Sequence, residues 1–462
     1  MIKRILKVLA EALSGEEKSY TTGSINRALI LLSIPMVLEM VMESLFAVVD
    51  VFFVSRIGVD AVATVGLTES VLTLIYSVAI GMSMAATAMV SRRIGEKDAE
   101  AAAKSAAQAI LLAFSLSVLV AIAGLVFAED ILRLMGGTPD VVASGAGYTR
   151  IMLGSNVVIM FLFLLNAIFR GAGDAAIAMR VLWVANLLNI ILDPLLIFGI
   201  GPFPELGVSG AAVATTIGRG VGVAYQLWIL FGGKSIIRLK LPLFKADWSI
   251  IRKLSDVAAT GAGQFLIASA SWVFLMRIIA LFGSESVAGY TIAIRLIVFT
   301  ILPAWGLANA AATLVGQNLG AQQPERAEKS VWRSAHFTML FLLSVAIIYF
   351  TFAYTLLSFF TNEPAVLEAG VLSIRIFSVS YIFFGYGMVI SNAFNGAGDT
   401  RTPTLVNLLC FWAVEIPLGY LLAVTLGWEL AGVCWAIAIS ESLMAIICIW
   451  LFRQGRWKTV QI

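Results

Sequence analysis

The segment GMSMAATAMVSRRIGEKD at 81–98 recurs at 306–323 as GLANAAATLVGQNLGAQQ, a shift of 306 − 81 = 225 residues. The same shift relates GAGD at 171–174 to GAGD at 396–399. The shift of 225 residues therefore holds without a gap from residue 81 to residue 174. A repeat of this length indicates that the chain arose from two copies of one unit.

The repeat divides the chain into two homologous halves. Toward the end of each half the shift falls slightly, and Pro194 aligns with Pro417. We predict an N-lobe over 20–233, a linker over 234–256 and a C-lobe over 257–455. Parallel repeats of this kind are common in secondary transporters, which bind their substrate where the repeats meet.

The composition is that of a membrane protein. Of the 462 residues 60% are hydrophobic and 13% charged, whereas soluble domains are about 25% charged. A net charge of +3 gives no reason to expect a nucleic-acid partner. A membrane span takes ~20 apolar residues in a helix. Twelve stretches qualify, near 29–54, 61–90, 104–128, 146–169, 181–200, 208–233, 257–282, 286–316, 331–360, 369–395, 403–425 and 429–452. The predicted fold is an all-α polytopic membrane protein with twelve transmembrane helices in two six-helix bundles.

The basic residues predict the orientation. An even number of spans places both termini on one side, and most of the 31 Lys and Arg residues fall in the loops and tails of that side. Because positive charge stays in the cytoplasm, we expect a multi-pass protein of the cell membrane with both termini cytoplasmic. The segment 1–19 has helical apolar spacing flanked by Lys and Arg, which predicts an amphipathic helix on the membrane surface; a frayed tail is the alternative. Residues 456–462 form the expected cytoplasmic tail.

The first span carries an acidic stripe. Glu39, Glu43 and Asp50 lie within ~40° of one another around a helix. Charges inside a bilayer cost at least a few kcal/mol each, so we interpret these residues as functional. In the fifth span Asn186, Asn189 and Asp193 lie within ~60° of one another.

Asp50 and Asp193 are candidates for one shared ion site. Counting from the nearest loop places them at similar depth, ~9 and ~12 Å from the same end of the lobe. Two close carboxylates resist double ionisation, so the pair could hold a proton. It could also hold Na⁺, for which Asn189 and a nearby hydroxyl would add oxygens. The alternative is that each carboxylate pairs with a separate Arg or caps a backbone group.

The repeat locates this site in one half only. Asp50 aligns with Leu275, and Asp193 with Ile416. The C-lobe therefore keeps the glycine framework but lacks these carboxylates, and we infer that ion coupling belongs to the N-lobe. Arg219 aligns with Glu441, which allows an ion pair across the two halves.

Several segments together resemble the MATE family, the multidrug and toxic compound extrusion transporters. They are YTTGSINRALILLSIP before and into the first span, LFAVVDVFFVSRIG around Asp50, NLLNIILDPLLIFGIG around Asp193, and the repeated GAGD and GVSGAAVAT segments. The match covers nearly the whole chain. It implies twelve helices in two V-shaped bundles around a central cavity, and export of organic cations or other amphipathic compounds against H⁺ or Na⁺.

The resemblance also implies roles for single residues. Asp50 and Asp193 would carry the ion, with Asn189 and Thr215 as further ligands. The substrate pocket would include Asn166, and Pro35 would bend the first span. To that pocket we add Glu39, Glu43 and Asn186 from the acidic stripe and its facing span. Some branches of the family place a carboxylate in the seventh span, where this chain has Gln264.

A flippase is the alternative function, and an intramembrane protease is disfavoured by the sequence. A flippase of lipids or lipid-linked oligosaccharides belongs to the same superfamily, but it would favour a strongly basic cavity. An intramembrane aspartyl protease also uses a GxGD element, but both GAGD segments here lie just past the end of a span. No GxxxxGK[ST] motif for ATP occurs. We therefore expect a monomeric exporter that is not an enzyme and needs no cofactor besides its coupling ion.

Overall fold

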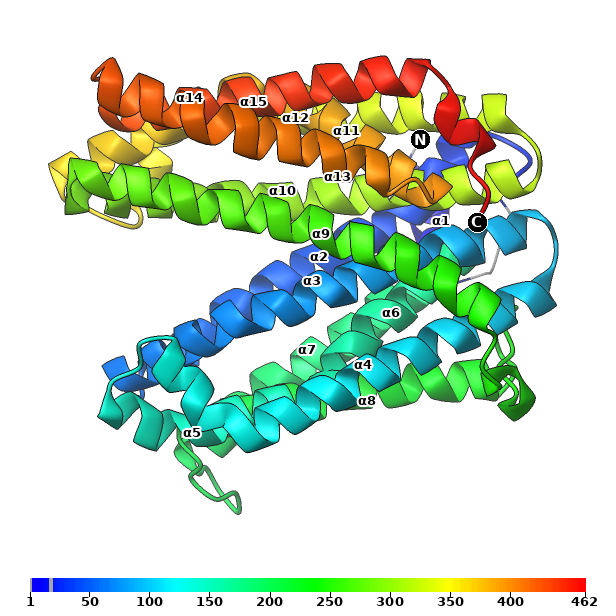
Figure 1. Ribbon diagram of the computed structural model, residues 1–462, viewed down its shortest axis with the longest axis horizontal. Helices are drawn as coiled ribbons and strands as arrows, with labels where there is room; N and C mark the ends of the chain where they lie inside the picture. The colour runs from blue at the N-terminus through cyan, green and yellow to red at the C-terminus, as the bar shows by residue number, and fades with distance from the viewer. Residues whose placement is uncertain (1, 16–19) are drawn as a thin grey trace.

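The computed structural model describes residues 2–15 and 20–462, and this part of the chain is helical, with short connections (Figure 1). The predicted segment 1–19 therefore lies partly outside the described residues. Helix α1 (Ile2–Ser14) packs against α2 (Ile25–Ser55). Ala12 of α1 shares a buried cluster with residues of α2 and α10.

The N-terminal bundle contains α2 and six further helices. They are α3 (Val59–Gly95), α4 (Ala99–Leu134), α5 (Pro139–Gly154), α6 (Asn156–Ala172), α7 (Ala175–Phe198) and α8 (Val208–Phe231). A continuous apolar core runs through this bundle.

The C-terminal bundle has its spans in the same order as the N-terminal one, although some are divided into shorter helical elements. Its elements are α9 (Trp248–Ile279), η2 (Ala280–Phe282), α10 (Ser284–Gly320), α11 (Pro324–Ser358), α12 (Pro364–Ala397), α13 (Arg401–Asn407), η3 (Leu408–Glu415), α14 (Ile416–Tyr420), η4 (Leu421–Thr425) and α15 (Glu429–Arg453), with η5 (Arg456–Thr459) in the tail. Two buried clusters form its core.

Among the described helices, length and composition identify eleven membrane spans. Ten are long and apolar enough to cross a bilayer singly, and α5 with α6 forms an eleventh, bent span. Helix α8 coincides with the predicted span at 208–233 and its 24 residues reach about 36 Å, but glycines and Arg219 lower its hydropathy below that of the other spans. The prediction of an all-α polytopic protein built on an internal repeat is confirmed.

The fourth span differs from its prediction as one straight helix over 146–169. It bends by 40° between α5 and α6, at Ser155. There the Asn156 side chain donates to the carbonyls of Ser117 and Leu153, at 3.0 and 2.7 Å. A Gly154–Ser155 pair is a common place for a kink. The amide of Asn156 bonds the Leu153 carbonyl beside the bend and ties the bend to α4 through Ser117.

The GAGD segments are turns between helices. Gly173 ends α6 in the left-handed region at φ 91°, and Asp174 then accepts from the backbone N–H of Ile177 to cap α7. In the second half Gly398 has φ 88°, and Asp399 accepts from the N–H of Thr402. Both aspartates therefore accept a hydrogen bond from the backbone N–H three residues further along, at equivalent turns.

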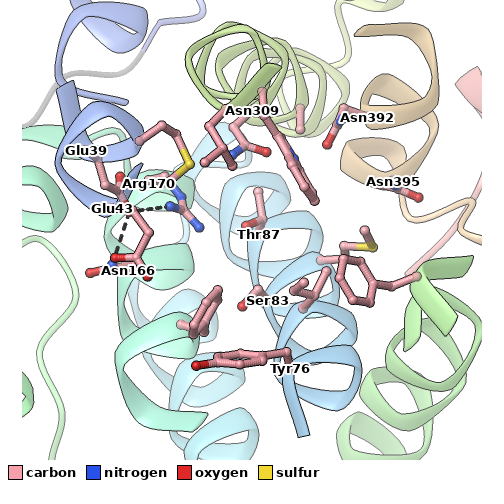
Figure 2. Close-up of a pocket in the computed structure, with 18 of the residues that line it drawn as sticks. Glu39, Glu43, Tyr76, Ser83, Thr87, Asn166, Arg170, Asn309, Asn392 and Asn395 are labelled. Atoms are coloured by element: carbon pink, nitrogen blue, oxygen red, sulfur yellow. Dashed lines mark hydrogen bonds and ion pairs between the residues drawn. The ribbon is translucent and has the colours of Figure 1, made fainter. Parts of the chain in front are cut away.

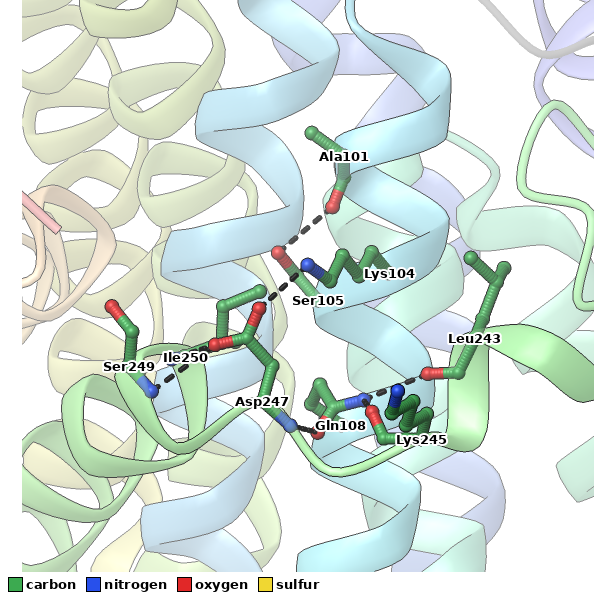
Figure 3. Close-up of polar contacts among 9 residues, drawn as sticks. All are labelled: Ala101, Lys104, Ser105, Gln108, Leu243, Lys245, Asp247, Ser249 and Ile250. Carbon is green, nitrogen blue, oxygen red and sulfur yellow. Dashed lines mark hydrogen bonds and ion pairs between the residues drawn. The ribbon is translucent and has the colours of Figure 1, made fainter.

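The linker between the bundles is attached to α4 (Figure 3). Gln108 of α4 donates to the carbonyls of Leu243 and Lys245, at 2.7 and 2.9 Å, and accepts from the N–H of Asp247. Asp247 caps α9 and also accepts from Lys104 at 2.6 Å. The start of the C-terminal bundle is thereby held to the N-terminal one.

The two bundles meet through α2 and α3 on one side and α9 and α10 on the other. Their ribbons lie closest toward the end of the molecule that carries both chain termini, here called the terminal end, and splay apart toward the opposite end (Figure 1). At the terminal end Arg92 of α3 donates to the carbonyls of Ala397 and Val460. Tyr20 donates its N–H to Gln317 of α10. These contacts join the bundles on one side of the molecule.

Candidate functional site

A cavity of about 310 Å³ lies between the two bundles (Figure 2). The N-terminal bundle contributes α2, α3, α6 and α7, and the C-terminal bundle contributes α9, α10 and α12. Aromatic and methionine side chains form much of its wall. The polar and charged lining residues are Glu39, Glu43, Thr73, Tyr76, Ser83, Thr87, Asn166, Arg170, Asn309, Thr313, Asn392 and Asn395.

Glu39 anchors one polar network of this cavity. It lies on α2 one turn after Pro35, and α2 runs through that proline as one helix. Its Oε1 accepts from Arg170 Nη1 at 2.7 Å and from Asn166 Nδ2 at 3.1 Å. Asn166 in turn accepts from Gln226 at 2.6 Å. The predicted pocket residues Glu39 and Asn166 are thus in direct contact.

Glu43 anchors a second network one turn further along α2. Its Oε1 accepts from Arg219 Nη2 at 3.2 Å, and Asn186 Nδ2 lies 3.4 Å from its Oε2. The Arg219 guanidinium also lies over the ring of Phe46, 5.1 Å from the centroid. Arg219 therefore pairs with Glu43 within its own bundle, not with Glu441 across the halves.

Asp193 and two predicted ligands form a third cluster, deep in the N-terminal bundle. Asp193 is fully buried. With the Asn189 amide oriented so that both its atoms have partners, its nitrogen donates to Asp193 Oδ2 at 3.0 Å and its oxygen accepts from Thr215 Oγ1 at 3.0 Å. Helices α7 and α8 hold this cluster, and they pack tightly because Gly218 approaches the carbonyl of Ala185.

Asp50 faces this cluster from α2. Its charge acts on Asp193 and on Arg219, but no hydrogen bond joins it to a described residue. Glu69 of α3 also lies within electrostatic range of Asp50. The structure therefore joins three of the four predicted ligands by direct contact, and Asp50 and Glu69 complete an acidic region of the same bundle.

Two functional residues were not singled out from the sequence, and a third was given another partner. Arg170 pairs with Glu39, and Glu69 lies beside Asp50; Arg219 was noted only for its alignment with a residue of the other half. Each is a charge inside or at the end of an apolar span, and this signal marks such residues as candidates. Their partners are far away in sequence, however, and only the fold shows which charges meet.

The C-terminal positions that align with Glu39, Asp50 and Asp193 carry no charge, whereas Glu441 aligns with Arg219. Gln264 replaces Glu39 and donates to Ser391 Oγ at 3.2 Å. Leu275, which aligns with Asp50, is buried in the apolar core. Among the positions that the repeat aligns, the carboxylates of the acidic region therefore occur in the N-terminal bundle alone.

Comparisons with known proteins agree with this architecture. The family model MatE matches the chain twice, over residues 35–195 and 261–421. The chain is 28% identical to the probable multidrug resistance protein NorM of Thermotoga maritima, over 94% of this chain and 93% of that protein. It is also 28% identical to the FAD transporter of Shewanella oneidensis, over 94% of this chain and 95% of that protein.

Solved structures show the same fold. A crystal structure of a MATE in complex with MaL6 superposes with a TM-score of 0.89 at 27% identity, covering 95% of this chain and 98% of that one. The two matches of the family model coincide with the two repeats, so each lobe is one copy of the family's unit.

Proposed function

Because the chain belongs to the MATE family of transporters, we propose that it is a secondary active multidrug exporter that exchanges organic cations or other amphipathic compounds for H⁺ or Na⁺. The observation that carries this proposal is the buried cluster of Asp193, Asn189 and Thr215 opposite Asp50, beside a cavity between two bundles. A cavity alone would suit a passive binding protein. Buried carboxylates near it add a site whose charge can change during transport.

In this proposal the N-lobe cluster binds the coupling ion. A proton would neutralise one carboxylate of the Asp50–Asp193 pair, because two close carboxylates resist double ionisation. Sodium would instead use oxygens of Asp50, Asp193, Asn189 and Thr215. Either ion would reduce the negative charge that acts on Arg219 and, through it, on Glu43. The ion site and the cavity would therefore be electrostatically linked.

The substrate would occupy the central cavity, next to Glu39, Glu43 and Asn166. Asn186 and Pro35, also predicted for the pocket, do not line the cavity, and Asn186 is buried behind Glu43. We propose that the terminal end faces the cytoplasm of a cell membrane and that the protein acts as a monomer. The contacts at that end would then close the cytoplasmic side, while the cavity would be accessible from the opposite side of the membrane. Alternating access would require these contacts to break and re-form in each cycle.

Gradient-driven efflux tests this proposal. Purified full-length protein in liposomes would be loaded with a fluorescent organic cation, and a proton or a sodium gradient would be imposed separately. We expect one gradient to drive efflux by the unaltered protein and Asp50→Asn to abolish it. Asp60→Asn, an exposed change in α3, is the matched control. Efflux by Asp50→Asn at the unaltered rate would refute coupling at this site.

Lipid transport is the second candidate. An apolar groove of about 460 Å³ lies between the bundles and is lined by Leu9, Leu29, Ile30, Ser33, Ile34, Val37, Leu38, Leu307, Ser334, Phe337 and Phe341. The cavity is not strongly basic, which disfavours an anionic headgroup. If neither gradient moves any of several cations, flipping of a fluorescent lipid in the same vesicles becomes the test.

A further inference from the structure

The cavity wall exposes one positively and one negatively charged side chain to a bound molecule. Its charged lining residues are Glu39, Glu43 and Arg170 (Figure 2). The side chain of Glu39 is 2% exposed and Arg170 covers it, while Arg170 is 12% and Glu43 26% exposed. Behind Glu43, Arg219 is 4% exposed. A molecule in the cavity would therefore meet a guanidinium and a carboxylate, not an acidic wall.

Arg170 has further N–H groups that can donate hydrogen bonds to a ligand. It gives Nη1 to Glu39, and this is its one hydrogen bond to the residues that the structure describes. A guanidinium carries five N–H groups. Its planar fork matches a carboxylate or a sulfonate with two parallel hydrogen bonds. The remaining N–H groups border the cavity, so a bound anionic group could reach them without breaking the pair with Glu39.

The repeat shows that the scaffold does not require this charge. Asn395 stands where Arg170 would align, and Gln264 where Glu39 would. The C-terminal bundle thus builds the same corner from neutral side chains, with Gln264 bonded to Ser391. Since charges inside a bilayer are costly, a corner that keeps both an acid and a base indicates a function for them.

We propose that Arg170 binds an anionic group, a carboxylate or sulfonate, of the exported compound, while Glu43 faces a cationic group of the same molecule. The preferred substrates are then amphoteric compounds. This inference rests on the proposed export function and adds its substrate class. Arg170 becomes a specificity-determining residue of the cavity.

A matched pair of dyes tests the proposal. Rhodamine B carries a cationic xanthene and a free carboxylate, and its ethyl ester carries the xanthene alone. Binding to the full-length protein in detergent would be measured by fluorescence anisotropy. We expect the free acid to bind about tenfold more tightly than the ester, as for one charge-assisted pair. Arg170→Gln should bring this ratio close to one by weakening the free acid alone.

Two further variants separate recognition from structure. Glu39→Gln frees more of the guanidinium, so the ratio should rise above that of the unaltered protein. If Arg170→Gln does not fold, the double variant E39Q/R170Q removes the pair together and should also show a ratio near one. Arg150→Gln, which lies outside the cavity and pairs with Glu129, is the control and should keep the original ratio.

An unchanged ratio in folded Arg170→Gln, or in the double variant, would overturn the proposal. So would an unaltered protein that binds both dyes equally. Efflux from liposomes reports separately on export. If the free acid binds selectively but no gradient moves either dye, the export function fails while the anion subsite stands.

Discussion

At the residue scale, two carboxylates of α2 in the cavity wall each pair with an arginine of another helix. Breaking a buried ion pair by removing one partner is costly because the other charge is left in a low-dielectric interior. Arg219 is the more deeply buried of the two arginines, and its other polar contact is a 3.5 Å bond to the hydroxyl of Tyr76. The buried charge of Arg219 is therefore stabilised mainly by Glu43.

Glu43→Gln should lower the free energy of unfolding by about 3 kcal/mol, because it leaves Arg219 without its carboxylate. The double variant E43Q/R219M should recover most of this loss, since it removes both charges. Thermal melting in detergent, followed by tryptophan fluorescence, measures the effect. Glu129→Gln, at an exposed ion pair, should change stability by less than ~1 kcal/mol. Equal losses for Glu43→Gln and Glu129→Gln would contradict this account.

The sequence predicted one member of each pair but not the pairing. Helical periodicity alone places Glu39 and Glu43 on one face of the first span. Their partners Arg170 and Arg219 lie 131 and 176 residues further along the chain, where no local pattern connects them. For the same reason the sequence placed both carboxylates in the substrate pocket without showing that each one pairs with an arginine.

At the element scale, glycines set how closely α3 and α10 approach at the terminal end. A Cβ atom on Gly95 would lie 2.0 Å from the carbonyl oxygen of Gln317, and one on Gly320 would lie 2.0 Å from that of Arg92. No rotamer change relieves a clash with backbone. The close approach of the two bundles therefore requires glycine at these positions.

Gly95→Ala should push the bundles apart at the terminal end and favour conformations open on that side. Spin labels on α4 and α11 near this end would report the change as a longer distance between the bundles. Gly66→Ala on the same helix is the matched control, because no atom lies within 4 Å of its added Cβ. An unchanged distance distribution in Gly95→Ala would show that these glycines do not set the closure.

The cap of α9 predicts a dependence on pH. The hydrogen bond from Lys104 lowers the pKa of Asp247 below its ordinary value of 3.8 (Figure 3). A lowered pKa stabilises the fold at every pH above 3.8, and this stabilisation is lost as pH falls through the lower folded value.

Asp247→Asn keeps a good N-cap but removes the charge. The unaltered protein should therefore melt at a higher temperature than Asp247→Asn from pH 7 down to about pH 4, and the difference should shrink only in stronger acid. Lys104→Met should lose the same advantage. A difference that disappears already between pH 7 and 5 would point to another group.

The elements themselves were largely predictable from the sequence, because long apolar stretches separated by Gly, Pro and charge identify spans. Their irregularities were not. Hydropathy cannot show the bend at Ser155, which depends on contacts of Asn156 with Ser117 on another helix. It also cannot show that the span predicted at 403–425 is partly π-helical, on both sides of α14, which contains Pro417.

At the scale of the whole molecule, two copies of one unit carry different chemistry. The shared glycines and GAGD turns build both bundles, while the acidic region belongs to the first. In the proposed function, the coupling ion would therefore act in the N-terminal bundle. The second bundle completes the cavity wall with α9, α10 and α12.

Substrate-driven ion movement tests this account most directly. In an antiporter the coupling is reciprocal, so a compound leaving loaded liposomes must bring the coupling ion inward even when no ion gradient is imposed. We predict that efflux of a fluorescent organic cation acidifies the lumen, or raises its sodium, in proportion to the dye released, and that Asp193→Asn stops both. Dye efflux by Asp193→Asn at the unaltered rate, or efflux by the unaltered protein without any ion entering, would contradict the account.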